Sequence, residues 1–351
     1  MAGTFIKLYN TDAEPDSAFF MAEGRIFFYA STVDKYAISG KNLIAGATEI
    51  IVREKIGGDV RRVETAVADG GSSLKRMSPE KIISGLKDYS VSLNVSMVLA
   101  RQVLLSNNII NANISLLEGD EKIVRELSIK YYHMIDRLRG EYEKRKFPWI
   151  KEILKNHEAS LAYKRGEAFF RSAEPVKITA TKNLADKTVD FERGEVICEE
   201  NTPGSEMYIL ESGAIDVIIK GNRVATIEDS GTVFGEMALL LGEKRTATLK
   251  AKNTVVVTRI KKEDLRYVAE KQQEVIEAIA IALAKRHYYN IIKIGGINRS
   301  IAESSLKNDE ERKTSPLDKT RKELASLKRD VEAASKGKDA SFLEDILAGD
   351  D

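Results

Sequence analysis

Short apolar runs separated by turn residues fill two parts of the chain. The first run, residues 18–30 (AFFMAEGRIFFYA), is interrupted around Gly24 and predicts two strands joined by a tight turn. Strand-like runs return between residues 178 and 260, with glycines at the turns. This pattern predicts two β-rich modules, which we place at residues 4–115 and 176–292.

Helical periodicity dominates the other segments. Residues 118–175 carry apolar side chains at three- and four-residue spacing and predict a helical connector between the modules. Residues 263–289 predict one helix. Residues 300–351 are a charged tail, helical or disordered, because 10 basic and 13 acidic side chains among residues 301–351 leave no independent core.

The two β-rich modules resemble each other in sequence. Gly46 and Gly235 are 189 residues apart (235 − 46), whereas Thr65 and Thr248 are 183 apart (248 − 65). Similar strings carry the same two offsets: residues 23–26 resemble residues 212–215 at 189, and Met77 and Ile260, which are 183 apart, lie in KRMSPEKI and TRIKKEDL. The chain therefore looks like two copies of one β-plus-helix module, which differ by six residues between the glycine and the threonine.

Composition narrows the class of protein. The 55 Lys and Arg residues nearly balance 54 Asp and Glu residues, so no global field favours nucleic acid, and we do not expect it as a partner. Cys198 has no internal partner and suits a reducing, cytoplasmic setting. The apolar stretch at residues 278–284 is too short to cross a bilayer, and the first residues lack a secretory signal pattern. We expect a soluble protein without a membrane segment.

The candidate chemistry lies in FGEMALLLGEKRTA, residues 234–247. Gly235 allows a close backbone approach, and the short helix that follows exposes N–H groups that attract an anion. Arg245 supplies a planar positive fork for phosphate oxygens, and Glu236 can accept hydrogen bonds from sugar hydroxyls. Together these groups fit a small molecule that carries a phosphate and a ribose.

Over residues 178–290, this segment and the upstream DFERGEVICEENTPGSEMYILESGAIDVII resemble the cyclic-nucleotide-binding domain of catabolite-activator-type regulators, protein kinase A regulatory subunits and cyclic-nucleotide-gated channels. The resemblance implies an α+β, mainly β fold of two double-stranded β-helix (jelly-roll-like) modules. It implies that Arg245 pairs with the cyclic phosphate and Glu236 with the ribose 2′-hydroxyl. The other implied contacts are Phe234, Gly235, Met237, Ala238, Leu239, Thr246 and Ala247, with base-pocket candidates Ile215, Val217 and Val224.

In this family the helix after the barrel closes over the base, so residues 263–289 become the expected lid. The lid or the tail would then meet a protein partner or a second copy of the chain. Thr246 suits either base, and we rank cAMP ahead of cGMP because no second guanine-reading group can be picked out.

The first module departs from the family pattern. Ala47 stands where the second copy has Glu236, although Arg62 aligns with Arg245 at the offset of 183. We expect a degenerate copy that keeps the barrel and binds no ligand. The alternative is that Glu49 replaces the missing acid.

No catalytic constellation is apparent. His133, His157 and His287 are scattered, and with one cysteine they suggest neither a metal site nor a nucleophile. We expect a receptor that is not an enzyme and needs no cofactor, with cAMP or cGMP as its ligand. Two alternatives remain open: a ligand-free scaffold in which Arg245 bridges Glu236, and a transcription regulator with an unrecognised DNA-binding surface.

Overall fold

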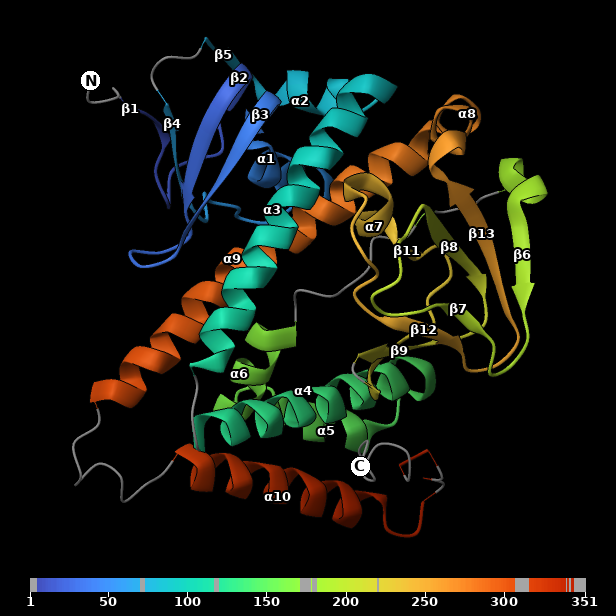
Figure 1. Cartoon of the computed structure of the whole chain (residues 1–351). Coiled ribbons are helices and arrows are strands. Elements are labelled where there is room, and N and C mark those ends of the chain that lie inside the picture. The colour runs from blue at the N-terminus through green and yellow to red at the C-terminus, as the bar shows by residue number, and fades with distance from the viewer. Residues whose placement is uncertain are drawn as a thin grey trace. The chain divides into compact units, whose positions relative to one another are not determined.

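The computed structural model describes residues 5–69, 73–116, 120–170, 178, 182–219, 221–306, 316–338, 340 and 342–343. The chain divides into two compact units (Figure 1). One comprises residues 1–107 and 174–291 and holds both β-rich regions. The other comprises residues 108–173 and 292–351 and is helical. The expected connector at 118–175 and tail at 300–351 therefore fall in one unit rather than in two separate segments.

The first β-rich region is one antiparallel five-stranded sheet. Its order is β1-β4-β2-β3, with β5 paired to β2. The expected turn at Gly24 is absent: β2 continues through it, and Gly24 pairs with Gly40 of the equally long β3. Its elements are β1 Phe5–Tyr9, β2 Ala18–Tyr29, β3 Lys35–Ala45, α1 Ala47–Lys55, β4 Thr65–Asp69, β5 Leu74–Met77, α2 Pro79–Gly85 and α3 Tyr89–Ser115.

The second β-rich region has two four-stranded antiparallel sheets, ordered β10-β9-β12-β7 and β11-β8-β13-β6. Apolar side chains of both sheets share one core, which includes Tyr208, Ile215, Phe234 and Val257. Its elements are η2 Lys182–Lys187, β6 Thr188–Phe191, β7 Val196–Cys198, β8 Glu206–Ser212, β9 Ile215–Ile219, β10 Asn222–Ile227, β11 Val233–Phe234, α7 Glu236–Leu241, β12 Thr248–Ala251 and β13 Val255–Lys261.

The prediction of a single helix at residues 263–289 is wrong. After the short η3 Lys262–Asp264, α8 Leu265–Lys271 ends at Gln272, whose φ of −148° and ψ of 81° are not helical. A new helix, α9, then runs over Gln273–Leu306. The break separates the short helix α8, which follows the second β-rich region, from the long helix α9, which continues well beyond residue 289.

The helical unit is built around a core shared by α4 Asp120–Arg145, α5 Pro148–His157, α6 Leu161–Phe170 and α10 Pro316–Ser335. The structure differs from the expected tail, because α10 buries Leu317, Leu327 and Val331 and the last two join this core. The buried side chains of α10 thus pack against helices that are distant in sequence. No helix in the described part of the chain is long and apolar enough to span a membrane.

Two glycines of this unit offer a matched pair of variants. A Cβ at Gly166 in α6 would overlap the Ser128 carbonyl of α4, and a backbone carbonyl cannot yield cheaply. A Cβ at Gly140 in α4 would meet nothing. We expect Gly166→Ala to lower the free energy of unfolding by about 1–3 kcal/mol and Gly140→Ala to raise it by about 0.5–1 kcal/mol. Urea denaturation followed by fluorescence of Trp149, which lies in this core, measures both. Equal effects would contradict the close helix crossing.

Candidate functional site

The second cassette, residues 234–247, begins with a glycine that ends a strand and starts a helix. β11 ends at Phe234, Gly235 adopts a φ of 80°, and α7 begins at Glu236. Only glycine adopts this conformation without cost. The first amides of a helix have no partner within the helix, so the amides at the start of α7 can donate to a ligand.

Arg245 lies directly beneath this turn. Its guanidinium is buried, with 6% of the residue exposed, and it donates from Nη1 to the Gly235 carbonyl at 3.1 Å and from Nη2 to the Glu206 carbonyl at 2.7 Å. The main chain of Arg245 is bonded to Thr202 and Asn201. Backbone groups thus hold the guanidinium in a fixed orientation.

Glu236, the first residue of α7, is 2% exposed. Its Oε1 atom lies 2.6 Å from Nη1 of Arg286, a residue of α9. The scaffold alternative expected a bridge from Arg245 to Glu236, but the guanidinium paired with this carboxylate comes from α9 instead. The expected ribose acceptor is therefore linked directly to the long helix after the roll.

The remaining predicted residues fall into three groups. Ala238 and Leu239 are buried in α7, and Met237 is half-buried there. Phe234, Ile215 and Val217 belong to the core of the second β-rich region. There the Phe234 ring stacks on the Tyr208 ring, with 5.3 Å between the ring centroids. After Arg245, Thr246 is exposed and Ala247 is half-buried. Val224 lies in β10, and its side chain is outside the part of the structure that is described.

The first β-rich region contains the same hydrogen bonds around Arg62. Gly46 has a φ of 81° and precedes α1. Arg62 donates from Nη1 to the Gly46 carbonyl at 2.8 Å and from Nη2 to the Ser17 carbonyl. Ser17 and Glu206 are 189 residues apart (206 − 17), as are Gly46 and Gly235. We call residues 46–62 the first cassette.

Strand registers repeat with the same two offsets. Ala18 pairs with Met77, and Met207 pairs with Ile260. Their first members are 189 residues apart and their second members 183 apart. The sheet orders β3-β2-β4-β1 and β10-β9-β12-β7 also correspond strand by strand. The two regions therefore share backbone pairing as well as sequence.

The first cassette differs in what its arginine meets. Glu49 places Oε2 2.9 Å from Arg62 Nη1, and each side chain is only 1% exposed. Glu49 Oε1 also accepts from the Val63 amide at 3.3 Å. The acid that we considered as a substitute for Glu236 is thus paired with the arginine itself.

Residue 287, next to Arg286 on α9, contacts the first cassette. His287 is fully buried, with Nδ1 2.9 Å from Thr48 Oγ1 and Nε2 2.8 Å from the Tyr36 hydroxyl. The Tyr36 hydroxyl donates to Glu64 at 2.7 Å, so its only proton is used and Nε2–H of a neutral imidazole must donate to it. Consecutive residues of α9 therefore touch the two cassettes.

Burial lowers the pKa of His287 to about 3. Between pH 6.5 and 3 the unfolded chain binds a proton at this position and the folded chain does not, so stability is lost as the pH falls through this range. Burial raises the pKa of Glu64, which has the opposite effect, so the variant His287→Gln must serve as the reference. We expect the wild type to lose up to about 1.4 kcal/mol more per pH unit than His287→Gln in thermal melts below pH 6. Parallel pH curves would contradict a neutral buried imidazole.

Two residues of the second cassette's surroundings carried no chemical signal in the sequence. Glu206 acts through its carbonyl, which every residue possesses. A Cβ at Gly204 would lie 2.5 Å from Ala238 Cβ and 2.7 Å from Arg245 Nε, so Gly204 lets its loop close on the arginine. The Pro-Gly pair suggests a turn but not this close approach.

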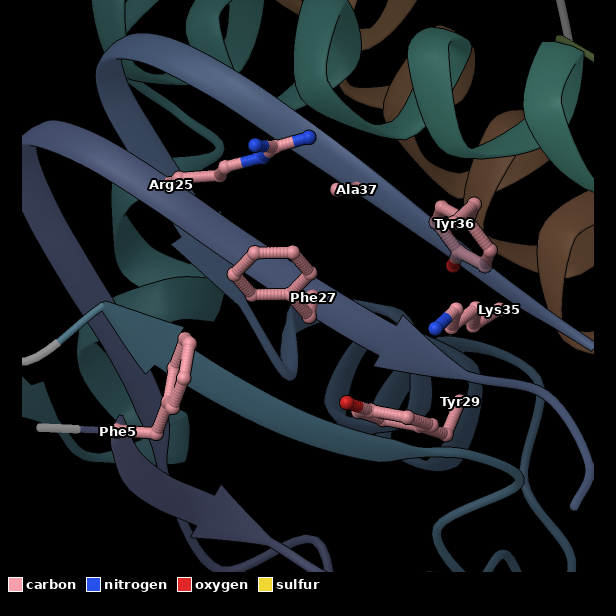
Figure 2. A pocket seen from close by; sticks show the side chains of 7 residues that line it. All are labelled: Phe5, Arg25, Phe27, Tyr29, Lys35, Tyr36 and Ala37. Carbon is pink, nitrogen blue, oxygen red and sulfur yellow. The ribbon is translucent and has the colours of Figure 1, made fainter. Parts of the chain in front are cut away.

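A surface pocket of about 420 Å³ lies on the first sheet, away from all predicted site residues. Figure 2 shows Arg25, Phe27 and Tyr29 along one strand, with Phe5 across from them. They alternate with the buried Ile26 and Phe28, so they occupy the outer face of the sheet. Among the described residues no cluster of three or more His, Cys, Asp or Glu side chains is placed to hold a metal ion.

Comparison with known proteins identifies the second region. Residues 188–272 match the family model "Cyclic nucleotide-binding domain". The chain is 37% identical to the mouse potassium/sodium hyperpolarization-activated cyclic nucleotide-gated channel 2 over 82 residues. These residues make up 23% of this chain and 9% of the channel. It is 39% identical to a cGMP-dependent protein kinase of Toxoplasma gondii over 64 residues, and this aligned segment makes up 18% of this chain and 6% of the kinase. The chain thus spans less than a tenth of these relatives and contains a cyclic nucleotide-binding domain.

Solved structures also align with parts of this chain. The regulatory domain of Toxoplasma gondii protein kinase A, crystallised with cAMP, covers 78% of this chain and 81% of its own length at 14% identity and a TM-score of 0.23. A cyclic nucleotide-binding-like protein from Brucella abortus covers 25% of this chain and 81% of its own at 23% identity and a TM-score of 0.23.

Proposed function

We propose that this chain is a cyclic nucleotide sensor whose second cassette binds one cyclic nucleotide. The observation that carries the proposal is the buried Arg245 guanidinium, which the carbonyls of Gly235 before α7 and Glu206 in β8 hold within the matched domain. In this assignment Arg245 pairs with the cyclic phosphate and Glu236 accepts from the ribose 2′-hydroxyl. A preoriented arginine fork suits phosphate oxygens, because little entropy is lost on binding.

The two β-rich regions are proposed to be tandem copies, of which the first binds no nucleotide. The repeated registers and the matching carbonyl contacts of Arg62 and Arg245 support a shared origin. Ala47 at the position of Glu236 supports the loss of ribose binding, because its methyl group cannot accept a hydrogen bond.

Binding is proposed to act on α9. Arg286 holds the carboxylate that the ribose would use, so nucleotide and Arg286 compete for Glu236. A ligand shifts such an equilibrium by its differential affinity for the two states. Release of Arg286 would change how α9 meets a protein partner or a second copy of the chain. The chain itself is proposed to be non-catalytic, with cAMP ranked ahead of cGMP.

Thermal unfolding with added nucleotide tests the sensor directly. A ligand at about a hundred times its dissociation constant should raise the free energy of unfolding by about 2.7 kcal/mol. cAMP and cGMP are compared with 5′-AMP, which carries the same base and sugar as cAMP but no cyclic phosphate. A chain that responds to neither cyclic nucleotide is the ligand-free scaffold instead, and retention of DNA on a filter at low salt would favour a transcription regulator.

Arg286→Gln tests the competition at Glu236. Because the variant no longer forms the ion pair with Glu236, the ribose hydroxyl meets no competitor for this carboxylate, and we expect cyclic nucleotide to bind about fivefold more tightly or better. Isothermal titration calorimetry measures the change. Lys285→Gln, which removes a positive charge one residue earlier on α9, is the matched control. Weaker binding by Arg286→Gln alone would show that the arginine assists the ligand rather than competing with it.

A further inference from the structure

At two corresponding positions, one cassette has a glutamate where the other has an alanine. At the offset of 189, Ala47 corresponds to Glu236 and Glu49 corresponds to Ala238. Glu49 is the third residue of α1 and Ala238 the third residue of α7. The second cassette therefore has a methyl group where the first has a carboxylate that reaches its arginine.

The Glu49 carboxylate meets the kinds of donor that a phosphate meets in such a cradle. It lies 2.9 Å from the guanidinium of Arg62 and accepts from the amide of Val63, the residue after that arginine. The ring of Tyr9 covers the guanidinium, with its centroid 4.2 Å from Arg62 Cζ. All of Arg62 is buried, and its Nε atom has no hydrogen-bond partner.

Charge balance explains why the carboxylate is needed. A buried guanidinium without a counter-charge is strongly destabilising, and Glu49 supplies that charge from within the chain. A phosphate from solution would have to enter beside a buried carboxylate of the same sign, which disfavours its binding.

We propose that Glu49 is a built-in anion of the first cassette, which occupies the phosphate position and keeps this cassette permanently loaded. The proposal rests on the proposed function in one respect, that an arginine in this position pairs with phosphate. Thr48, next to Glu49, contacts His287, so the loaded cassette gives α9 a fixed attachment point. The neighbouring Arg286 contacts the cassette that responds to nucleotide. One nucleotide per chain is then sufficient to act on α9.

Removing the built-in anion should create a site for an external one. The full chain is prepared as wild type, Glu49→Ala and the double variant Glu49→Ala with Arg62→Met. Thermal unfolding is followed with increasing inorganic phosphate or sulfate at constant ionic strength. We expect Glu49→Ala to lower Tm by about 5 °C or more. Phosphate or sulfate should recover most of this loss with a saturable dose response.

The other variants separate this effect from general salt stabilisation. Wild type reports any response of the second cassette, and the double variant, which lacks the guanidinium, should respond no more than wild type. Glu64→Gln removes a buried carboxylate that is not bonded to Arg62 and should gain no anion response. If Glu49→Ala does not fold, Glu49→Ser also vacates the space of the carboxylate, and the same phosphate response is expected.

The proposal is overturned if phosphate and sulfate raise the Tm of the Glu49 variant no more than that of wild type. It is also overturned if equilibrium dialysis finds two equivalents of cyclic nucleotide bound per wild-type chain. A wild-type chain that binds no cyclic nucleotide contradicts the proposed function alone, because the phosphate comparison does not depend on nucleotide binding.

Discussion

Replacing Arg245 with alanine is expected to weaken the binding of cyclic nucleotide about thirtyfold or more, which corresponds to roughly 2–5 kcal/mol. The bound phosphate would lose the full positive charge that Arg245 supplies, and backbone amide donors carry only partial charge. Isothermal titration calorimetry with cAMP and cGMP measures the loss.

Two controls separate the lost ion pair from other effects of this substitution. Lys244→Ala removes the adjacent positive charge, which is exposed, and should change the affinity little. Arg245→Lys keeps the charge but loses the fork that donates to the Gly235 and Glu206 carbonyls, so we expect an intermediate affinity. Unchanged affinity in Arg245→Ala, with an unchanged circular dichroism spectrum, would remove this residue from the site.

The second cassette could be predicted from sequence because its chemistry lies in one short segment. Gly235, Glu236 and Arg245 stand within eleven residues, and a glycine that requires a φ of 80° leaves a visible signal. The partner of Glu236 could not be predicted. Arg286 is 50 residues away, on a helix whose periodic pattern identifies only the buried apolar face.

The fold was predictable where local patterns decide it and not where distant partners do. Short apolar runs between turn residues indicated both β-rich regions, but the glycine at position 24 indicated a turn, whereas β2 continues through it and pairs with the long strand β3. In the tail, charge indicated solvent exposure. Leu327 and Val331 are nevertheless fully buried, because helices from residues 120–170 supply the apolar surface that the tail lacks.

The sequence also aligned Arg62 with Arg245 but left open what Arg62 meets. Both arginines bond to two backbone carbonyls, so their scaffolds are the same. The difference lies in a glutamate that is 13 residues from Arg62 along the chain. Whether an acid at that distance pairs with the arginine depends on the direction of α1, which sequence spacing alone does not specify.

Replacing Arg62 with methionine is expected to lower the free energy of unfolding by about 3–5 kcal/mol, because it leaves the carboxylate of Glu49 buried without a counter-charge. Both side chains are 1% exposed, so solvent cannot take over the role of the guanidinium. Arg245→Met should cost less, because Arg245 is bonded to carbonyls and leaves no buried carboxylate behind.

The double variant Arg62→Met with Glu49→Met should recover much of the loss, since it removes both charges and keeps apolar volume. Trp149 belongs to the helical unit, so its fluorescence does not report on this region. Hydrogen exchange of the amides in α1 and β4, compared among the single variants, the double variant and wild type, measures the local free energy of opening. If Arg62→Met and the double variant opened equally often, the pair would contribute packing rather than charge neutralisation, and the cost of the single substitution would come from the missing side-chain volume.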